Sequence, residues 1–336
     1  MMPNSMTLRR WGLLVPLLGA LTGPAAAQPL RLYTTLNNSK GYVVGSRLAQ
    51  SGLFRHDADT SWTFNGWSLP RISGVAADPA NPRRRYLAAG NGVMVTQDLG
   101  RSWRLATDWR VTEVQDVAAE PGRAYAGSAY GIWRSEDGGL TWMESSAGIP
   151  EMKRYTQDLE VDAAQAGRIL AGTDGGVYIS EDAGRSWRLA GPVVPVYDLA
   201  QSASNPRRWF AGTSGHGLYR SDDGGRTWTA VAPRYARTSF LGVAIDPRND
   251  RRIAAASYGQ GLLVSTDGGR TWTARTRGLR TPNVYSVLFD VNVPGRLWVG
   301  TVEGGIYTTD DLGRTFRYAG MNGTLVFDLA FLPEPQ

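Results

Sequence analysis

Ser221-Asp222-Asp223-Gly224-Gly225-Arg226-Thr227-Trp228 is one copy of a pattern that returns along the whole chain. Its general form is Ser/Thr-x-Asp-x-Gly-x-Ser/Thr-Trp, where x is any residue. Clear copies are centred on Asp98, Asp137, Asp182, Asp223, Asp267 and Asp311, the last with Phe316 in place of tryptophan, and a degenerate copy is centred on Asp57. Successive aspartates are 39–45 residues apart, which is the length of a four-stranded propeller blade.

Each repeat carries the same order of expected strands, separated by turns rich in Gly, Pro and Arg. Innermost strands are expected at 114–118, 196–200 and 240–244, second strands at 169–172 and 297–300, third strands at 176–180 and 217–221, and fourth strands from Trp103, Trp142, Trp187, Trp228 and Trp272. The sequence therefore predicts an all-β fold: a seven-bladed β-propeller of four-stranded antiparallel blades.

The two ends of the chain indicate how the ring closes. Residues 326–331 form a lone innermost strand with no blade after it, whereas 41–45 and 53–54 are expected to be middle strands of the first blade. We expect the C-terminal strand to complete this N-terminal blade, which leaves no exposed sheet edge at the junction. Residues 30–36 fit either an alternative innermost strand or an outer addition.

Composition limits the possible chemistry. The 336 residues include no cysteine and two histidines, His56 and His216. Disulfides, thiolate metal sites and a cysteine nucleophile are excluded, and we expect no metal and no cofactor. The formal net charge of +6 comes mostly from arginine, which suits carboxylate and phosphate partners, although a modest excess charge also limits self-association.

The first 27 residues have the features of a secretory signal peptide: Arg9 and Arg10, an apolar segment from Trp11 to Leu21, and small residues at Ala25–Ala27. An uncleaved anchor is the alternative. Residues 28–336 are then expected to form one propeller domain that is secreted or periplasmic after cleavage near Ala27, is monomeric and has no transmembrane span. Export argues against nucleic acid as a partner.

With seven copies of its motif, the chain resembles the Asp-box (BNR-repeat) β-propellers, most closely the seven-bladed photosystem II stability and assembly factors. Sialidases and xyloglucan-cleaving glycoside hydrolases are more distant relatives. The resemblance implies that the six clear Asp boxes are structural turns on the face away from the ligand. It implies the fold more strongly than a function, because Asp boxes occur in enzymes and non-enzymes.

Strand direction places two kinds of loop on one face, the channel-mouth face: the connections between blades and the hairpins between second and third strands. Arginines and tyrosines in or beside these loops form the candidate partner site: Arg71, Arg154, Tyr155, Tyr197, Arg237, Arg280 and Tyr285. A partner protein, or an acidic or carbohydrate ligand, would dock there. The alternative is that these arginines are simply part of a solvated surface and bind no partner. On the opposite face, the arginines at 83–85, 207–208 and 251–252 lie near acidic residues and are expected to be structural.

One aligned column near the start of the innermost strands reads Gly74, Asp116, Asp158, Asp198, Gly242, Ser286 and Asp328. Its carboxylates could bind a cation or supply an acid–base pair, or could instead bond backbone N–H groups of neighbouring blades. The enzyme alternative is an exported glycoside hydrolase, sialidase-like or xyloglucanase-like, that uses Asp158 and Asp198. The sialidase Phe/Tyr-Arg-Ile-Pro element is missing, however, and the chain supplies only one propeller. A binding or assembly scaffold without a catalytic residue is the favoured interpretation.

Overall fold

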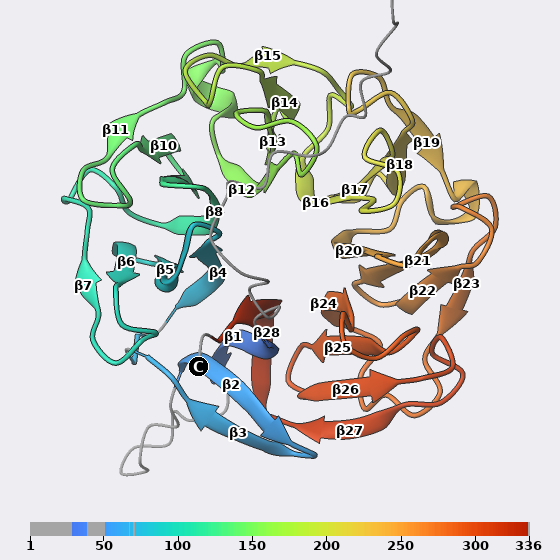
Figure 1. Cartoon of the computed structure of the whole chain (residues 1–336). Coiled ribbons are helices and arrows are strands. Elements are labelled where there is room, and N and C mark those ends of the chain that lie inside the picture. The colour runs from blue at the N-terminus through green and yellow to red at the C-terminus, as the bar shows by residue number, and fades with distance from the viewer. Residues whose placement is uncertain (1–28, 39–50, 67, 70, 335–336) are drawn as a thin grey trace, which may run out of the picture.

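The computed structural model describes residues 29–38, 51–66, 68–69 and 71–334. These residues form seven antiparallel sheets of four strands each, arranged radially around a common centre (Figure 1). Two single-turn 3-10 helices, η1 (Glu151–Lys153) and η2 (Pro233–Tyr235), lie in connections between blades. The predicted all-β, seven-bladed propeller is confirmed.

The strands fall into four concentric sets. The innermost set is β4 (Ile72–Asp78), β8 (Val114–Glu120), β12 (Thr156–Val161), β16 (Val196–Gln201), β20 (Phe240–Asp246), β24 (Val284–Phe289) and β28 (Thr324–Pro333). The second set is β1 (Leu30–Asn38), β5 (Asn81–Ala89), β9 (Arg123–Ser128), β13 (Ile169–Thr173), β17 (Trp209–Thr213), β21 (Asn249–Ser257) and β25 (Leu297–Thr301). The third set is β2 (Gly52–Ala58), β6 (Gly92–Thr96), β10 (Gly131–Ser135), β14 (Gly176–Ser180), β18 (Leu218–Ser221), β22 (Gly261–Ser265) and β26 (Ile306–Thr309). The outermost set is β3 (Ser61–Phe64), β7 (Arg104–Leu105), β11 (Met143–Glu144), β15 (Arg188–Leu189), β19 (Thr229–Val231), β23 (Thr273–Arg275) and β27 (Arg317–Gly320).

The hydrophobic core lies between neighbouring blades. Strands such as β13, β14 and β22 are buried along their whole length, because each blade is covered on both faces. One cluster joins Leu262 and Val264 of β22 to Val287 of β24 and Val299 of β25. The outermost strands are mostly short and exposed, and those after the five predicted tryptophans begin one residue later than expected.

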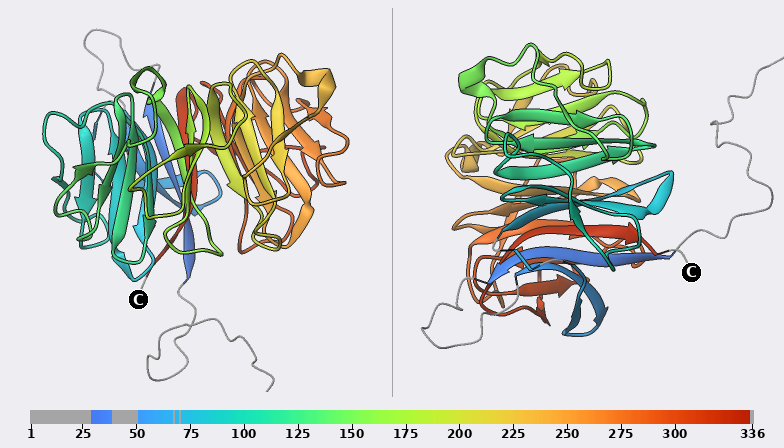
Figure 2. Two further views of the ribbon diagram at one scale, coloured as in Figure 1. Left: turned by 90° about the horizontal axis from the view of Figure 1, so that it is seen from above. Right: turned by 90° about the vertical axis from the view of Figure 1, so that its left-hand side faces the viewer.

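The predicted closure is confirmed. Strand β28 pairs with β1 in an antiparallel register that runs from Leu30 opposite Pro333 to Asn38 opposite Thr324, and the two strands lie side by side in Figure 2. Neither interpretation of residues 30–36 was right, because this segment is the second strand of the first blade. Residues 53–54 lie in the third strand, as a middle strand should, and the expected strand at 41–45 falls outside the described residues.

The Asp boxes are hydrogen-bonded turns between third and fourth strands. Asp223 accepts bonds from the Ser221 hydroxyl at 2.8 Å, the Thr227 N–H at 2.9 Å and the Thr227 hydroxyl at 2.6 Å. Partial burial opposes ionisation, but these donors hold the pKa of Asp223 at about 2. Glycine is required at Gly225, where φ is +79° and an added Cβ would lie 2.5 Å from Leu170 of the preceding blade. The structural interpretation of the six boxes is supported.

The degenerate copy does not form this turn. Asp57 accepts bonds from Thr63 at 2.5 Å and Arg55 at 3.2 Å, and it lies within the hairpin of β2 and β3. Arg55 stands where the boxes have Ser or Thr, and Asp59 where they have glycine. The chain turns at Asp59 and Thr60 without the box hydrogen bonds.

Loops sort onto the two faces as strand direction predicted. Arg168, which precedes a second strand, donates a hydrogen bond to Gly224 O in the Asp box of the next blade. On the same face Arg84 lies 2.9 Å from Asp78, and Arg208 lies 2.8 Å from Asp250. Arg84, Arg208 and Arg252 of this Asp-box face are thus engaged in ion pairs within the propeller.

Candidate functional site

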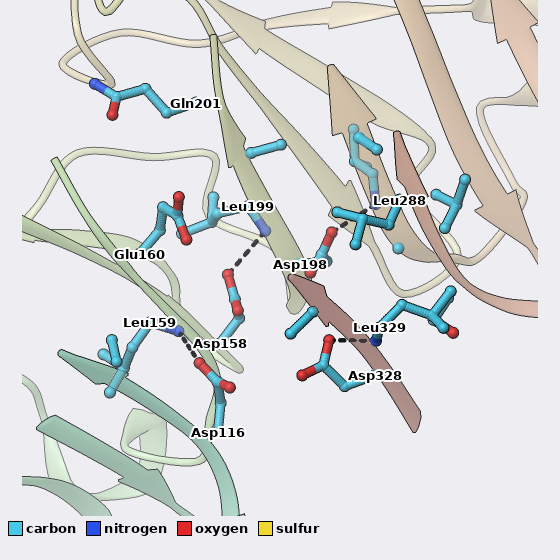
Figure 3. A pocket seen from close by; sticks show the side chains of 18 of the residues that line it. Asp116, Asp158, Leu159, Glu160, Asp198, Leu199, Gln201, Leu288, Asp328 and Leu329 are labelled. Atoms are coloured by element: carbon cyan, nitrogen blue, oxygen red, sulfur yellow. Dashed lines mark hydrogen bonds between the residues drawn. The ribbon is translucent and has the colours of Figure 1, made fainter. Parts of the chain in front are cut away.

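A belt of carboxylates joins the innermost strands. Each aspartate of the predicted column accepts a bond from a backbone N–H of the following blade: Asp116 from Leu159 at 3.0 Å, Asp158 from Leu199 at 2.9 Å, Asp198 from Val243 at 2.5 Å and Asp328 from Val75 at 3.3 Å. Figure 3 shows the bonds of Asp116 and Asp158. Ser286 occupies the same position in its blade and donates a bond to Val326 O at 3.1 Å. The expectation that these carboxylates bond neighbouring backbone groups is confirmed.

Beneath the belt lies a cavity of about 550 Å³. Burial, with smaller effects from neighbouring carboxylates, raises the pKa of Asp116 and Asp158 well above the usual range. Burial raises the pKa of Asp328 to about 6 against two opposing backbone hydrogen bonds. Burial and the charges of nearby carboxylates raise the pKa of Glu160, on the cavity wall, to about 8. Among the described residues, no group of three or more His, Asp or Glu side chains is arranged to hold a metal ion.

Every innermost strand contains a β-bulge directly before the column position. A bulge inserts one unpaired residue and re-aims its side chain. The inserted residues are Ser73, Gln115, Gln157, Tyr197, Leu241, Tyr285 and Phe327, and all seven line a second, smaller depression of about 90 Å³. The floor of the channel mouth is thus built from one bulge residue of each blade.

Arg71 joins this floor from the connection that leads into β4. Its guanidinium donates a hydrogen bond to Gln115 and lies 5.9 Å from the ring centre of Phe327. Tyr285 meets Phe327 edge to face at 5.6 Å between ring centres. Burial raises the pKa of Tyr285, while the charge of Arg71 opposes this shift. The result is a compact cluster of one cation, two aromatic rings and an amide.

The seven predicted partner residues separate into two groups. Arg71, Tyr197 and Tyr285 line the depression, and Tyr155 is close enough to affect the titration of Tyr285. The remaining arginines lie apart from this cluster. Arg154 is held by Glu144 at 2.9 Å and Ile149 O at 3.1 Å, Arg280 reaches Asn322 at 2.9 Å, and Arg237 is exposed.

Two classes of residue on this face escaped the sequence-based candidate set. Gln115 and Gln157 reach the depression only because of the bulges, which depend on strand register and leave no compositional signal. Met152 and Val193, 90% and 71% exposed, are apolar side chains in connections between blades. Exposed apolar residues in predicted inter-blade loops would have been the available signal.

Comparison with known proteins supports the repeat and the fold. The BNR/Asp-box repeat family matches residues 219–230 and 263–274, which contain the boxes of Asp223 and Asp267. No curated protein is significantly similar to the chain in sequence. The described residues include no helix long and apolar enough to cross a membrane.

Several solved structures share the architecture. The GH74 xyloglucanase from Xanthomonas campestris is 20% identical with a TM-score of 0.64, over 85% of this chain and 54% of that one. The extracellular domain of BT4673 from B. thetaiotaomicron is 16% identical with a TM-score of 0.64, over 83% and 38%. YCF48 from Cyanidioschyzon merolae is 16% identical with a TM-score of 0.57, over 73% and 84%.

A structure of YCF48 bound to D1 peptide is 18% identical with a TM-score of 0.56, over 73% of this chain and 81% of that one. The chain thus spans about half of the xyloglucanase, and less of the B. thetaiotaomicron domain, but most of YCF48. At these identities the likeness concerns the fold, which enzymes and binding proteins share. The chain is a seven-bladed β-propeller with BNR/Asp-box repeats.

Proposed function

We propose that this chain is an exported, non-enzymatic binding scaffold whose partner docks on the channel-mouth face. The observation that carries the proposal is the cluster of Arg71, Tyr285 and Phe327 on the floor of the mouth. Arginine and aromatic side chains in a partly desolvated depression are typical of residues that dominate interface energies. Residues 1–27 supply the signal peptide in this proposal.

The proposed partner is an acidic segment of a protein. Arg237 and Arg280 are exposed on the rim, and neither makes an ion pair with a carboxylate of the described residues. Trp109 and Met152, 84% and 90% exposed, offer apolar contacts in other connections between blades. The structure of YCF48 bound to D1 peptide supports the idea that a propeller of this size serves as a peptide-binding scaffold.

The hydrogen bonds of the carboxylate belt support a non-enzymatic role. Asp158 and Asp198 each use an oxygen to hold the next blade, which gives both residues a structural function. Their raised pKa values are the observation that favours the alternative, a glycoside hydrolase. The two functions predict different behaviour of the Asp158→Asn variant, which keeps the side-chain shape and a carbonyl acceptor.

Binding is tested with a fluorescent peptide rich in Asp and Glu and a Lys-rich counterpart, by anisotropy over a range of salt concentrations. The wild-type protein should prefer the acidic peptide, and its affinity should fall as salt rises. The double variant Arg237→Glu/Arg280→Glu should bind about tenfold or more weakly at an unchanged melting temperature. Equal affinity of the double variant would refute the proposed surface.

The matched control is Arg101→Glu, which reverses an exposed arginine of the Asp-box face. Arg84 and Arg208 are unsuitable because their ion pairs with Asp78 and Asp250 stabilise the ring. Hydrolysis is tested in parallel with xyloglucan and a sialoside. Turnover that disappears in Asp158→Asn or Asp198→Asn would replace the scaffold by the hydrolase. Sequencing the N-terminus of the exported protein should place its start near Gln28.

A further inference from the structure

A cleft between the sixth and seventh blades opens on the Asp-box face, opposite the channel mouth. Its volume is about 440 Å³, and its walls include Arg252, Arg275 and Arg314 together with the hydroxyl-bearing Thr266 and Thr273. The cleft separates the Asp box centred on Asp267 from the one centred on Asp311. No part of the proposed docking surface contributes to it.

Arg314 lacks the acidic partner that Arg185 and Arg226 have, and within the described residues Arg101 and Arg270 form no such ion pair either. At two other blade junctions the box arginine reaches the acidic residue just before the preceding box aspartate: Arg185 lies 2.9 Å from Glu136, and Arg226 lies 3.2 Å from Glu181. At this junction the corresponding residue is Thr266. Arg314 accordingly has no side-chain partner within the described part of the chain.

Arg275 is a second guanidinium that makes no hydrogen bond or ion pair with a described residue. It pairs with Leu262 in the β22–β23 ladder, the place that Val231 takes opposite Leu218 one blade earlier. Its side chain packs against Gly313, where an added Cβ would lie 3.0 Å from the Arg275 Cβ. Its Nε is buried and makes no hydrogen bond to any described residue. A buried donor without an acceptor is costly, so the described residues leave the charge of this guanidinium uncompensated.

The acidic groups of the cleft are already engaged. Asp310 binds Arg296 at 2.7 Å and also Arg317, and Asp311 accepts the hydrogen bonds of its own box. Arg252 approaches Asp246 only to 3.5 Å, whereas Arg84, at the same place in its blade, reaches Asp78 at 2.9 Å. The cleft therefore presents two guanidinium groups, of Arg275 and Arg314, that pair with no side chain of the described ranges, and a third, of Arg252, that is weakly paired.

We infer that this cleft binds a small ligand of about sugar size that carries an oxyanion, either a carboxylate or a phosphate. Guanidinium groups bind both with two parallel hydrogen bonds. The volume exceeds what an inorganic ion fills, and the hydroxyls of Thr266 and Thr273 can bond the hydroxyl groups of such a ligand. The inference is independent of the proposed docking surface.

The test uses three probes of similar size, galacturonate, glucose 6-phosphate and neutral galactose, titrated calorimetrically at low ionic strength. At least one anion should bind saturably and galactose should not; the tighter anion identifies the acidic group. Thr266→Glu should restore the ion pair that Glu181 makes with Arg226 and should weaken anion binding about 10–100-fold. Arg275→Val, which installs the residue of the preceding blade, should weaken it similarly.

The control Arg101→Ala removes an exposed box arginine of the same face, far around the ring, and should leave the dissociation constant unchanged. Melting temperatures establish that every variant is folded. If neither anion binds the wild-type protein, or if Thr266→Glu binds as tightly as wild type, the inference is wrong. An equal loss in Arg101→Ala would show non-specific attraction to a basic face and would also overturn it.

Discussion

Deletion of residues 325–336 tests how the ring is held together. The deletion removes β28 except Thr324, including Val326, Leu329 and Leu332, which are 0%, 5% and 4% exposed. Burying an aliphatic side chain contributes about 1.5–3 kcal/mol, so these three contribute about 5–9 kcal/mol as an upper estimate. The stability of a whole domain is about 5–15 kcal/mol. We therefore expect the truncated protein to be largely unfolded, because β1 also loses its ladder partner.

Urea unfolding followed by circular dichroism measures the effect, with a protein that lacks only residues 335–336 as control. Since the deletion could prevent purification, Leu329→Ala provides a graded test and should cost about 2–5 kcal/mol. A truncated protein with the midpoint and slope of the parent would refute the closure, as would a Leu329→Ala variant of unchanged stability.

Two further predictions concern the carboxylates. Asp223→Ala should lower the free energy of unfolding by about 1–2 kcal/mol, because the hydrogen bonds that Asp223 accepts are only partly shielded from water. Asp57→Ala, which lies outside a true box, should lower it by less when both variants are measured by urea unfolding. Equal losses in the two variants would contradict the box geometry. The free energy of unfolding should also fall as the pH rises from about 5 to 8. Asp328 and Glu160 have pKa values of about 6 and 8 in the folded protein, so they retain protons there that the unfolded chain releases near pH 4. The free energy of unfolding should also fall as the pH drops below about 4. The box aspartates with a pKa of about 2 in the folded protein are protonated at higher pH in the unfolded chain, which favours unfolding. Glu160→Gln should reduce the loss of stability between about pH 5 and 8. A wild-type protein whose urea midpoint rises up to pH 8 would contradict the raised pKa values of Asp328 and Glu160.

Blade number and box positions could be predicted because each box is local: its donors and acceptors lie within seven residues of one another. The role of residues 30–36 could not be predicted, because a strand's place in a sheet is set by its partners. β1 pairs with β28, which lies at the other end of the chain. The closure itself was still predictable, since an unpaired innermost strand at 326–331 requires a sheet to join.

The candidate site was only partly predictable for a related reason. Sequence assigns Arg71 and Arg154 alike to mouth-face loops, but the structure places Arg71 in the depression and ties Arg154 to Glu144. The side chains that form the floor depend on the bulges, and a one-residue change of register moves a side chain to the opposite side of a strand. The bulge positions of different blades can be compared only when the strand pairing and its register are known.

The repeats then allow structural and functional positions to be separated within one chain. A residue that recurs from blade to blade serves the fold: the box aspartates bond their own turns, and the belt aspartates bond the next blade. The bulge column behaves differently, with Ser73 in one blade and Tyr285 in another, although every blade has the same backbone irregularity. Thr266 and Arg275 likewise differ from the residues that other blades have at the same positions. Because the recurring positions bond turns and neighbouring blades and so stabilise the ring, recognition is expected at the positions where single blades differ.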